Sequence, residues 1–82
     1  MLYKIVFKPQ SLKDGKKISK KELERIFEKI EALKKNMFGD VKHLTNSEPE
    51  YRLWVGDYRV LFEVEGEAIV VYRIRHRKDI YR

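Results

Sequence analysis

The feature that most constrains the fold of this chain is an alternation of apolar and polar residues on either side of Gly56-Asp57. The flanking segments, Tyr51–Val55 and Tyr58–Val64, are rich in β-branched and aromatic side chains. Two such segments separated by two turn residues predict a β-hairpin. Because a two-residue turn fixes the pairing register, it also fixes which side chains share a face of the sheet.

The predicted register places Val55 opposite Tyr58 and Trp54 opposite Arg59. One face then carries mostly apolar side chains, which we expect to form the core: Tyr51, Leu53, Val55, Tyr58, Val60 and Phe62. The other face, which we call the open face, carries Arg52, Trp54, Arg59, Leu61 and Glu63. Two arginines and a tryptophan are therefore expected on a sheet face that the core does not cover.

An amphipathic helix is predicted to cover the core face. Ser19 and Glu22 have the spacing of a capping box, and the apolar residues that follow recur every three or four positions. This pattern predicts a helix from about residue 20 to residue 36, with Asn36 and Gly39 as its stop signals. Its outer Lys/Glu face is that of a solvated helix, because membrane-surface helices usually have a more one-sided basic face.

Shorter elements are expected around this helix and hairpin. Residues Leu2 to Phe7 predict a first strand that ends at Pro9, and residues 9–17 predict one helical turn followed by a loop. Val41–Leu44 predicts a further short strand. Together these elements predict one α+β domain over residues 1–82, with two layers: an N-terminal strand, a helical hairpin, and an antiparallel meander of four to five strands under the helices.

The parity of the last strand, Ala68–Ile74, depends on the turn near Gly66. A three-residue loop at 65–67 would place Arg73 beside Arg59, with Arg75 on the same open face. A two-residue loop would reverse this parity, and the sequence leaves both loops open. We favour the first, because it avoids turning two arginines into the core. The residues that it turns toward the core are Ala68, Val70, Tyr72 and Ile74.

The composition of the chain excludes several kinds of site and segment. The absence of cysteine excludes disulfides, thiolate zinc sites and cysteine nucleophiles, and two histidines without a carboxylate cluster argue against a transition-metal site. No apolar run approaches the ~20 residues that cross a bilayer, and the N-terminus lacks the layout of a signal peptide. We therefore expect a cytoplasmic protein that binds no metal or cofactor and does not enter a membrane.

Positive charge gathers at the C-terminal end. The last ten residues hold five of the nineteen Lys and Arg residues and one of the thirteen acids, which gives +4 of the formal net charge of +6. Such a cluster favours a polyanion, because each neutralised phosphate releases condensed counterions. A single arginine on a strand face is more often solvated, but a tryptophan among several arginines offers a stacking surface for single-stranded RNA. The expected group is Arg52, Trp54, Arg59, Arg73 and Arg75.

Three ring-bearing residues have structural as well as functional interpretations. His76 is either a half-buried histidine at a strand end or, between Arg75 and Arg77, a neutral imidazole that exchanges protons near pH 7. We assign His43 a structural role. Tyr81, taken alone, is a C-terminal aromatic that packs against the sheet edge.

Two motifs together resemble the RelE/ParE toxin superfamily, nearer its RelE branch. They are the segment YRLWVGDYRVLFEV at 51–64 and the segment RHRKDIY at 75–81, and the order of elements resembles that family along nearly the whole chain. The resemblance implies a toxin encoded with an antitoxin such as RelB. It also implies a ribosome-dependent endoribonuclease, in which the ribose 2′-hydroxyl of the mRNA attacks the adjacent phosphate without a metal.

The resemblance assigns roles by position. Arg59 matches the arginine that grips the scissile phosphate, Arg75 the arginine that stabilises the transition state, and Tyr81 the C-terminal aromatic that orients the substrate. Arg52 and Trp54 stand where the best-studied branch has basic side chains, the second of them a lysine. Because arginine cannot serve as a general base, the candidates for proton transfer are His76, Tyr81 and Lys78. Contacts with RNA or the ribosome are expected from Trp54, Arg73, Arg77, Lys78 and Arg82.

Two other functional classes share these features. One is a toxin of the ParE branch that acts on DNA gyrase without cutting nucleic acid, and the other is a non-catalytic RNA-binding module. The presence together of Arg59, Arg75, His76 and Tyr81 favours the nuclease. Because Trp54 stands where the family has a lysine, reduced or lost nuclease activity is the alternative outcome.

Overall fold

In the computed structural model, which describes residues 3–35, 41–43, 49 and 51–80, the hairpin that the sequence predicts forms around Gly56. Gly56 has a φ of 58°, in the left-handed region that glycine enters without steric cost. Strands β3 (Tyr51–Val55) and β4 (Tyr58–Glu65) pair with Val55 opposite Tyr58 and Trp54 opposite Arg59. The predicted register of the hairpin is confirmed.

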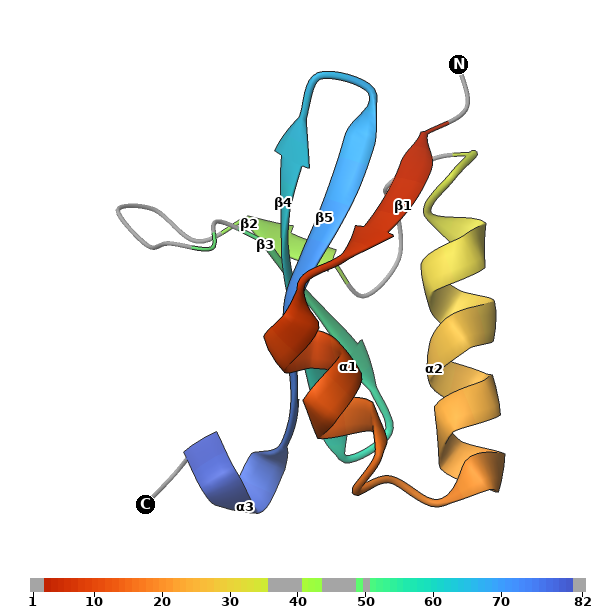
Figure 1. Cartoon of the computed structure of the whole chain (residues 1–82), viewed down its shortest axis with the longest axis vertical. Coiled ribbons are helices and arrows are strands. Elements are labelled where there is room, and N and C mark those ends of the chain that lie inside the picture. Colours follow the sequence, from red (N-terminus) through yellow and green to blue (C-terminus); the bar gives the residue numbers. More distant parts are fainter. Residues whose placement is uncertain (1–2, 36–40, 44–48, 50, 81–82) are drawn as a thin grey trace.

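The described strands form one five-stranded sheet in the order β1-β5-β4-β3-β2 (Figure 1). Strand β1 (Lys4–Phe7) runs parallel to β5 (Ala68–His76), and all other neighbours are antiparallel. Strand β2 (Val41–His43) pairs with β3, which confirms the short strand predicted there; Leu44 lies outside the described residues. The mixed α+β architecture with an antiparallel meander is therefore confirmed, and the parallel β1 strand adds an edge to it.

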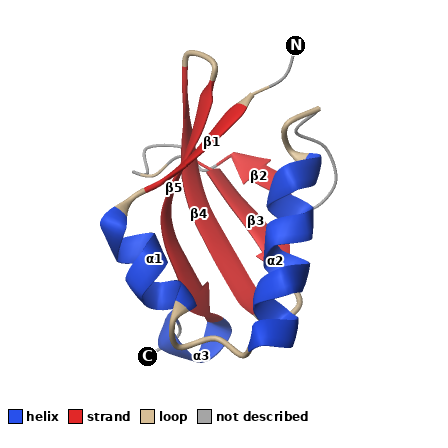
Figure 2. Ribbon diagram, turned by 45° about the vertical axis from the view of Figure 1, so that its right-hand side comes forward, coloured by secondary structure: helices blue, strands red, loops and turns tan. Residues whose placement is uncertain are grey.

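Helix α2 (Lys20–Ala32) packs against β3 and begins at the predicted capping residue (Figure 2). The Ser19 hydroxyl accepts a hydrogen bond from the Glu22 backbone N–H at 3.4 Å. The helix ends earlier than predicted, because the Leu33 and Lys34 N–H groups bond to carbonyls three residues back and tighten the last turn. The predicted stop signals Asn36 and Gly39 lie outside the described residues.

Helix α1 (Pro9–Gly15) is longer than the single turn predicted, and it packs against β5. Pro9 supplies the first helical position, where a missing N–H costs nothing. The buried side of α1 consists of Ser11, Asp14 and Gly15. Because this side is small and polar, it leaves no apolar period in the sequence, and the prediction therefore stopped after one turn.

The turn before β5 corrects the prediction for the last strand. The loop has two residues, since Glu65 pairs with Ala68, and the expected three-residue loop is wrong. The register then shifts by one residue between Leu61 and Phe62, which leaves Tyr72 as the extra residue of a β-bulge. The bulge restores the predicted parity for the second half of β5, so that Arg73 and Arg75 both lie on the open face. The expected pairing of Arg73 with Arg59 is wrong, because Arg75 lies opposite Arg59 and Arg73 lies opposite Leu61.

The core lies between α2 and the covered face of the sheet. Val60, Phe62, Ile69 and Val71 are each 0% exposed, and Phe62 stacks on the Tyr51 ring at 5.4 Å. Before the bulge, Ile69 and Val71 face this core in place of the predicted Ala68, Val70 and Tyr72; after the bulge Ile74 faces it as predicted. Along the described part of the chain no helix is long and apolar enough to span a bilayer.

Candidate active site

Two cross-strand rows bring the predicted basic residues together on the open face. Trp54, Arg59 and Arg75 lie side by side on β3, β4 and β5 in one row. Arg52, Leu61 and Arg73 form the next row. Directly opposite residues on neighbouring strands have Cβ atoms about 4.5–5.5 Å apart, so the side chains within each row are in contact range.

Trp54 organises two of these arginines. The Arg59 guanidinium lies over the indole ring at 4.5 Å, and the Arg52 guanidinium lies over it at 5.7 Å. Both distances are within the range of a cation–π attraction. Arg59 is only 9% exposed, so the surrounding residues restrict the conformations that its side chain can adopt. Trp54 therefore serves here as a platform for positive charge.

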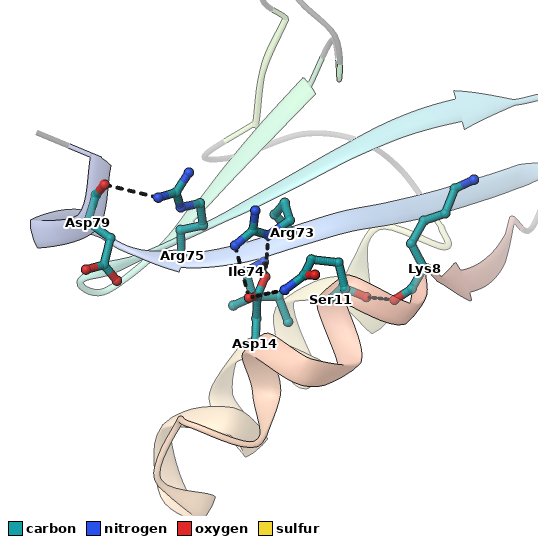
Figure 3. Close-up of polar contacts among 8 residues, drawn as sticks. Lys8, Ser11, Asp14, Arg73, Ile74, Arg75 and Asp79 are labelled. Carbon is teal, nitrogen blue, oxygen red and sulfur yellow. Dashed lines mark hydrogen bonds and ion pairs between the residues drawn. The ribbon is translucent and has the colours of Figure 1, made fainter. Parts of the chain in front are cut away.

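Arg75 completes the first row. Its Nη2 atom donates a hydrogen bond at 3.1 Å to the backbone carbonyl of Asp79, in helix α3 (Arg77–Ile80) (Figure 3). Arg59 and Arg75 thus approach the open face from adjacent strands with planar, always-charged groups. Such a pair can hold the oxygens of one phosphate and stabilise added negative charge on it.

Arg73 is engaged differently from the other open-face arginines. Its Nε and Nη2 atoms donate to the Asp14 carboxylate at 2.8 and 3.2 Å (Figure 3). The same carboxylate accepts the backbone N–H of Ile74 at 3.0 Å, at the edge of β5 beyond its last pairing with β1 at Phe7. Asp14 thereby substitutes for a neighbouring strand at this edge, and Arg73 ties the sheet to α1. This geometry favours a structural role for Arg73 over the expected RNA contact.

The pKa of Asp14 reflects this environment. Burial alone would raise the pKa, but hydrogen bonds from Arg73, Ile74 and Gln10 and the Arg73 charge outweigh it and lower the pKa below its ordinary value. The carboxylate is therefore charged throughout the neutral range, and a negative charge is fixed next to the basic rows.

His76 is not brought to the two rows. It lies opposite Tyr58 on the covered side of β5, and its ring meets the Tyr58 ring edge-to-face at 5.1 Å. Alternation along the strand sends Arg75 and His76 to opposite faces. His76 therefore does not join Arg59 and Arg75 in their row, because neighbouring residues in this regular end of β5 point to opposite faces.

A pocket of about 330 Å³ opens where β5 ends. Its wall is formed by Asp14, Lys17, Ile18, Tyr58, Arg73, Ile74, Arg75, His76 and Asp79. Burial, a hydrogen bond to Glu22 and nearby carboxylates raise the pKa of Tyr58, which keeps its phenol protonated at neutral pH. Arg75 and His76 reach this pocket from the two sides of the same strand.

The remaining predicted residues lie in or beyond α3. Arg77 and Lys78 are exposed, and the Arg77 backbone N–H donates to the Asp57 carbonyl at 2.8 Å. Tyr81 and Arg82 lie outside the described residues, so their assigned roles stay predictions.

Sequence reasoning missed Lys42 and Asp14. Lys42 on β2 pairs with Arg52 and extends the second row by one more cation. The position of Lys42 depends on how β2 pairs with β3. The sequence between these two strands contains no turn motif that would fix the pairing register. Asp14 carried no signal in the sequence, because its partners Arg73 and Ile74 lie 59 and 60 positions away.

Comparison with known proteins agrees with the fold and with the two motifs. Residues 5–81 match the family described as the ParE toxin of the type II toxin–antitoxin system parDE. The putative toxin RelE1 of Methanocaldococcus jannaschii is 30% identical over 88 aligned positions, which cover 100% of this chain and 98% of that protein. Toxin RelE3 of the same organism is 43% identical over 42 residues, 51% of this chain and about half (48%) of that toxin's length.

A solved structure shows the same arrangement. The toxin–antitoxin complex RelB–RelE from Methanococcus jannaschii contains a chain that superposes with a TM-score of 0.79 at 32% sequence identity. The match covers 93% of this chain and 94% of that one.

Proposed function

This chain belongs to the RelE/ParE family of type II toxins, and from that premise we propose that it cleaves mRNA on the ribosome as a RelE-like endoribonuclease. The observation that carries the proposal is the pairing of Arg59 with Arg75 on the open face. The two arginines of the family motifs are distant in sequence and adjacent in space. A toxin of this kind acts in the cytoplasm, where its ribosomal substrate is found.

In the proposed reaction the mRNA lies across the open face with one phosphate between Arg59 and Arg75. The ribose 2′-oxygen forms a bond to phosphorus while the bond from phosphorus to the 5′-oxygen breaks. The 2′-hydroxyl proton leaves to a base, and the departing 5′-oxygen receives a proton. The phosphoryl group gains negative charge on the way, and fixed guanidinium groups stabilise that charge more than they stabilise the substrate.

The other proposed site residues act by charge and stacking. Arg52 and Arg59 cannot accept a proton, so their contribution is electrostatic. Trp54 offers the face of its indole to an unpaired base next to the phosphate. Tyr81 remains the proposed proton-transfer or orienting group of the family motif. The exposed side chains of Arg77 and Lys78, with Arg82, are proposed to contact ribosomal RNA.

A second candidate is a ParE-like toxin that acts on gyrase, because the matching family description is that of ParE toxins. The Arg59–Arg75 pair and the two RelE relatives favour the nuclease. Inducing the protein in cells separates the two functions. Translation arrest with cut transcripts would support the nuclease, whereas intact transcripts with blocked replication would support the gyrase poison.

We also propose a RelB-like antitoxin as the partner of this chain. The support is the RelB–RelE complex that its structure resembles. An open face with several cations and an aromatic ring suits an acidic, amphipathic segment, which would neutralise the site by covering it.

The direct test is cleavage of a defined mRNA held on purified ribosomes, with the new ends mapped by primer extension. We expect a cut within the codon in the decoding site and none in the same RNA without ribosomes. The exposed α2 residue Lys21 offers a control, because Lys21→Ala removes a positive charge from the helix that covers the other face of the sheet and should cleave at the wild-type rate. Intact mRNA on ribosomes that the protein demonstrably binds would contradict the proposal.

Trp54 gives a second prediction. Because it is the only tryptophan, its fluorescence should change when single-stranded RNA binds the open face. Trp54→Ala should weaken binding of a short RNA by about tenfold, since base–aromatic stacking is worth about 1–3 kcal/mol, while Trp54→Phe keeps most of the affinity. Affinities from fluorescence anisotropy of labelled RNA provide the measurement. Equal affinity of the wild type and the alanine variant would remove Trp54 from the RNA site.

A further inference from the structure

Helix α3 is held in place by three hydrogen bonds from residues around it. The Asp57 carbonyl accepts the Arg77 N–H at 2.8 Å, the His76 Nδ1 atom accepts the Lys78 N–H at 3.1 Å, and the Asp79 carbonyl accepts from Arg75 at 3.1 Å. A helix of four residues cannot be stable by its own hydrogen bonds, because its backbone groups are mostly terminal ones. Its position is therefore set by these contacts.

The hydrogen bond to His76 defines the state of the imidazole. An Nδ1 atom can accept a hydrogen bond only when it carries no proton, so this contact requires the tautomer with its proton on Nε2. His76 directly precedes the first residue of α3, and it receives the N–H of the second one. This is the contact that an N-cap side chain makes.

The same helix also positions Arg75. The Arg75 guanidinium bonds to the Asp79 carbonyl, so displacement of α3 would release the guanidinium from its orientation beside Arg59. The side chains of His76 and Arg75 point to opposite faces of β5, and each forms a hydrogen bond with a residue of α3. A histidine on the covered side of the strand can thus influence the open face without touching it.

We propose that His76 is a positioning residue: its neutral imidazole caps α3, and α3 in turn fixes the Arg75 guanidinium for the phosphate. The link to catalysis rests on the proposed nuclease function, whereas the cap itself does not. This role replaces the proton transfer expected for His76 from the sequence. It also predicts a pH dependence, because protonation of Nδ1 would turn an acceptor into a donor that faces the Lys78 N–H.

The direction of that pH dependence follows from the cap itself, which requires an Nδ1 atom that carries no proton. Histidine is the side chain that changes charge between about pH 5 and 8. The titratable and charged groups that line the pocket with His76 are Asp14, Lys17, Tyr58, Arg73, Arg75 and Asp79; the Tyr58 ring meets the His76 ring edge-to-face, and the Lys78 N–H donates to Nδ1. The cap needs an Nδ1 atom that carries no proton, so acidification is expected to remove it.

Two substitutions separate capping from proton transfer. His76→Asn retains a side-chain oxygen that can accept the Lys78 N–H but cannot transfer protons near neutral pH, while His76→Ala retains neither property. We expect hydrogen exchange of the Lys78 amide to accelerate about fivefold in the alanine variant and to return to within about twofold of wild type in the asparagine variant. Cleavage rates should follow the same order, and acidification should slow the wild type but not His76→Asn.

Each result decides the proposal. Recovery of both amide exchange and cleavage by His76→Asn supports it. Unchanged Lys78 exchange in His76→Ala would overturn the cap, and recovery of exchange without recovery of cleavage would show that the imidazole acts directly on the substrate. If the wild type itself does not cleave ribosome-bound mRNA, the proposed function fails, and the exchange measurements still decide whether His76 caps α3.

Discussion

Replacing Arg59 with alanine is expected to reduce cleavage of ribosome-bound mRNA by about 10²–10³-fold, the usual cost of removing one preorganised group that stabilises a developing anion. Arg59 is suited to this role because it is 9% exposed, stacked on Trp54 and directly opposite Arg75. Its guanidinium therefore needs little reorganisation when the phosphate gains charge. Primer extension under single-turnover conditions measures the loss.

Arg59→Lys tests whether charge alone suffices. An ammonium group keeps the positive charge but loses the planar fork and the stacking on Trp54, so we expect an intermediate loss of about tenfold. The unfolding midpoint of each variant must be measured alongside, because a buried arginine also contributes to packing. A folded Arg59→Ala protein that cleaves at the wild-type rate would refute the assignment of this residue.

A double variant distinguishes a joint site from two separate ones. If Arg59 and Arg75 stabilise the same phosphate, removing both should cost clearly less than the product of the two single losses. Strictly multiplicative losses would instead indicate that the two arginines contact different parts of the RNA.

The sequence contained enough information to predict the hairpin and the first half of the site. A two-residue turn fixes the register of its strands, and that register alone places Trp54 beside Arg59. The capping residue Ser19 likewise marked the start of α2 correctly. These features were predictable because each depends on residues that are close in sequence.

The second half of the site depended on contacts that no local pattern encodes. The parity of β5 was predicted correctly at Arg73 and Arg75 for the wrong reason, because a shorter loop and a bulge at Tyr72 offset each other. The Tyr72 hydroxyl donates to Glu63 at 3.1 Å and its ring lies under the Lys8 ammonium, so the bulged residue is held on the open side. Alternation rules assume a regular strand, and a bulge breaks that assumption.

His76 shows the corresponding limit for chemistry. A histidine between two arginines in a basic segment satisfies the composition of an active site, but strand alternation places His76 on the face opposite Arg75 and the open-face arginines. Only the side of the strand, and the path of the chain after it, distinguish a catalytic imidazole from a helix cap. The family motif fixes which residues occur together and leaves open what each one contacts.

Asp14→Asn is expected to lower the free energy of unfolding at pH 7 by about 2 kcal/mol, within the range for hydrogen bonds to a charged group. The carboxylate accepts from Arg73 and from the Ile74 N–H, and its side chain is 8% exposed. Asparagine has a single acceptor oxygen and would turn its amide N–H₂ group toward one of these donors. The ion-pair share of the loss is small, because the Arg73 side chain is 37% exposed and screened by solvent.

The same substitution should remove part of the acid sensitivity of the fold. Because the pKa of Asp14 is lower in the folded state than in the unfolded chain, its contribution is fully present above the ordinary aspartate pKa of about 3.9 and is lost as the pH falls through the lower folded-state value. Urea unfolding followed by Trp54 fluorescence should therefore show the largest gap between wild type and Asp14→Asn near neutral pH, and the gap should shrink toward pH 2. The exposed Asp57 offers a matched control, since Asp57→Asn should change stability little at either pH. A gap for Asp14→Asn that stays constant down to pH 2 would mean that the carboxylate charge does not hold α1 to the edge of β5.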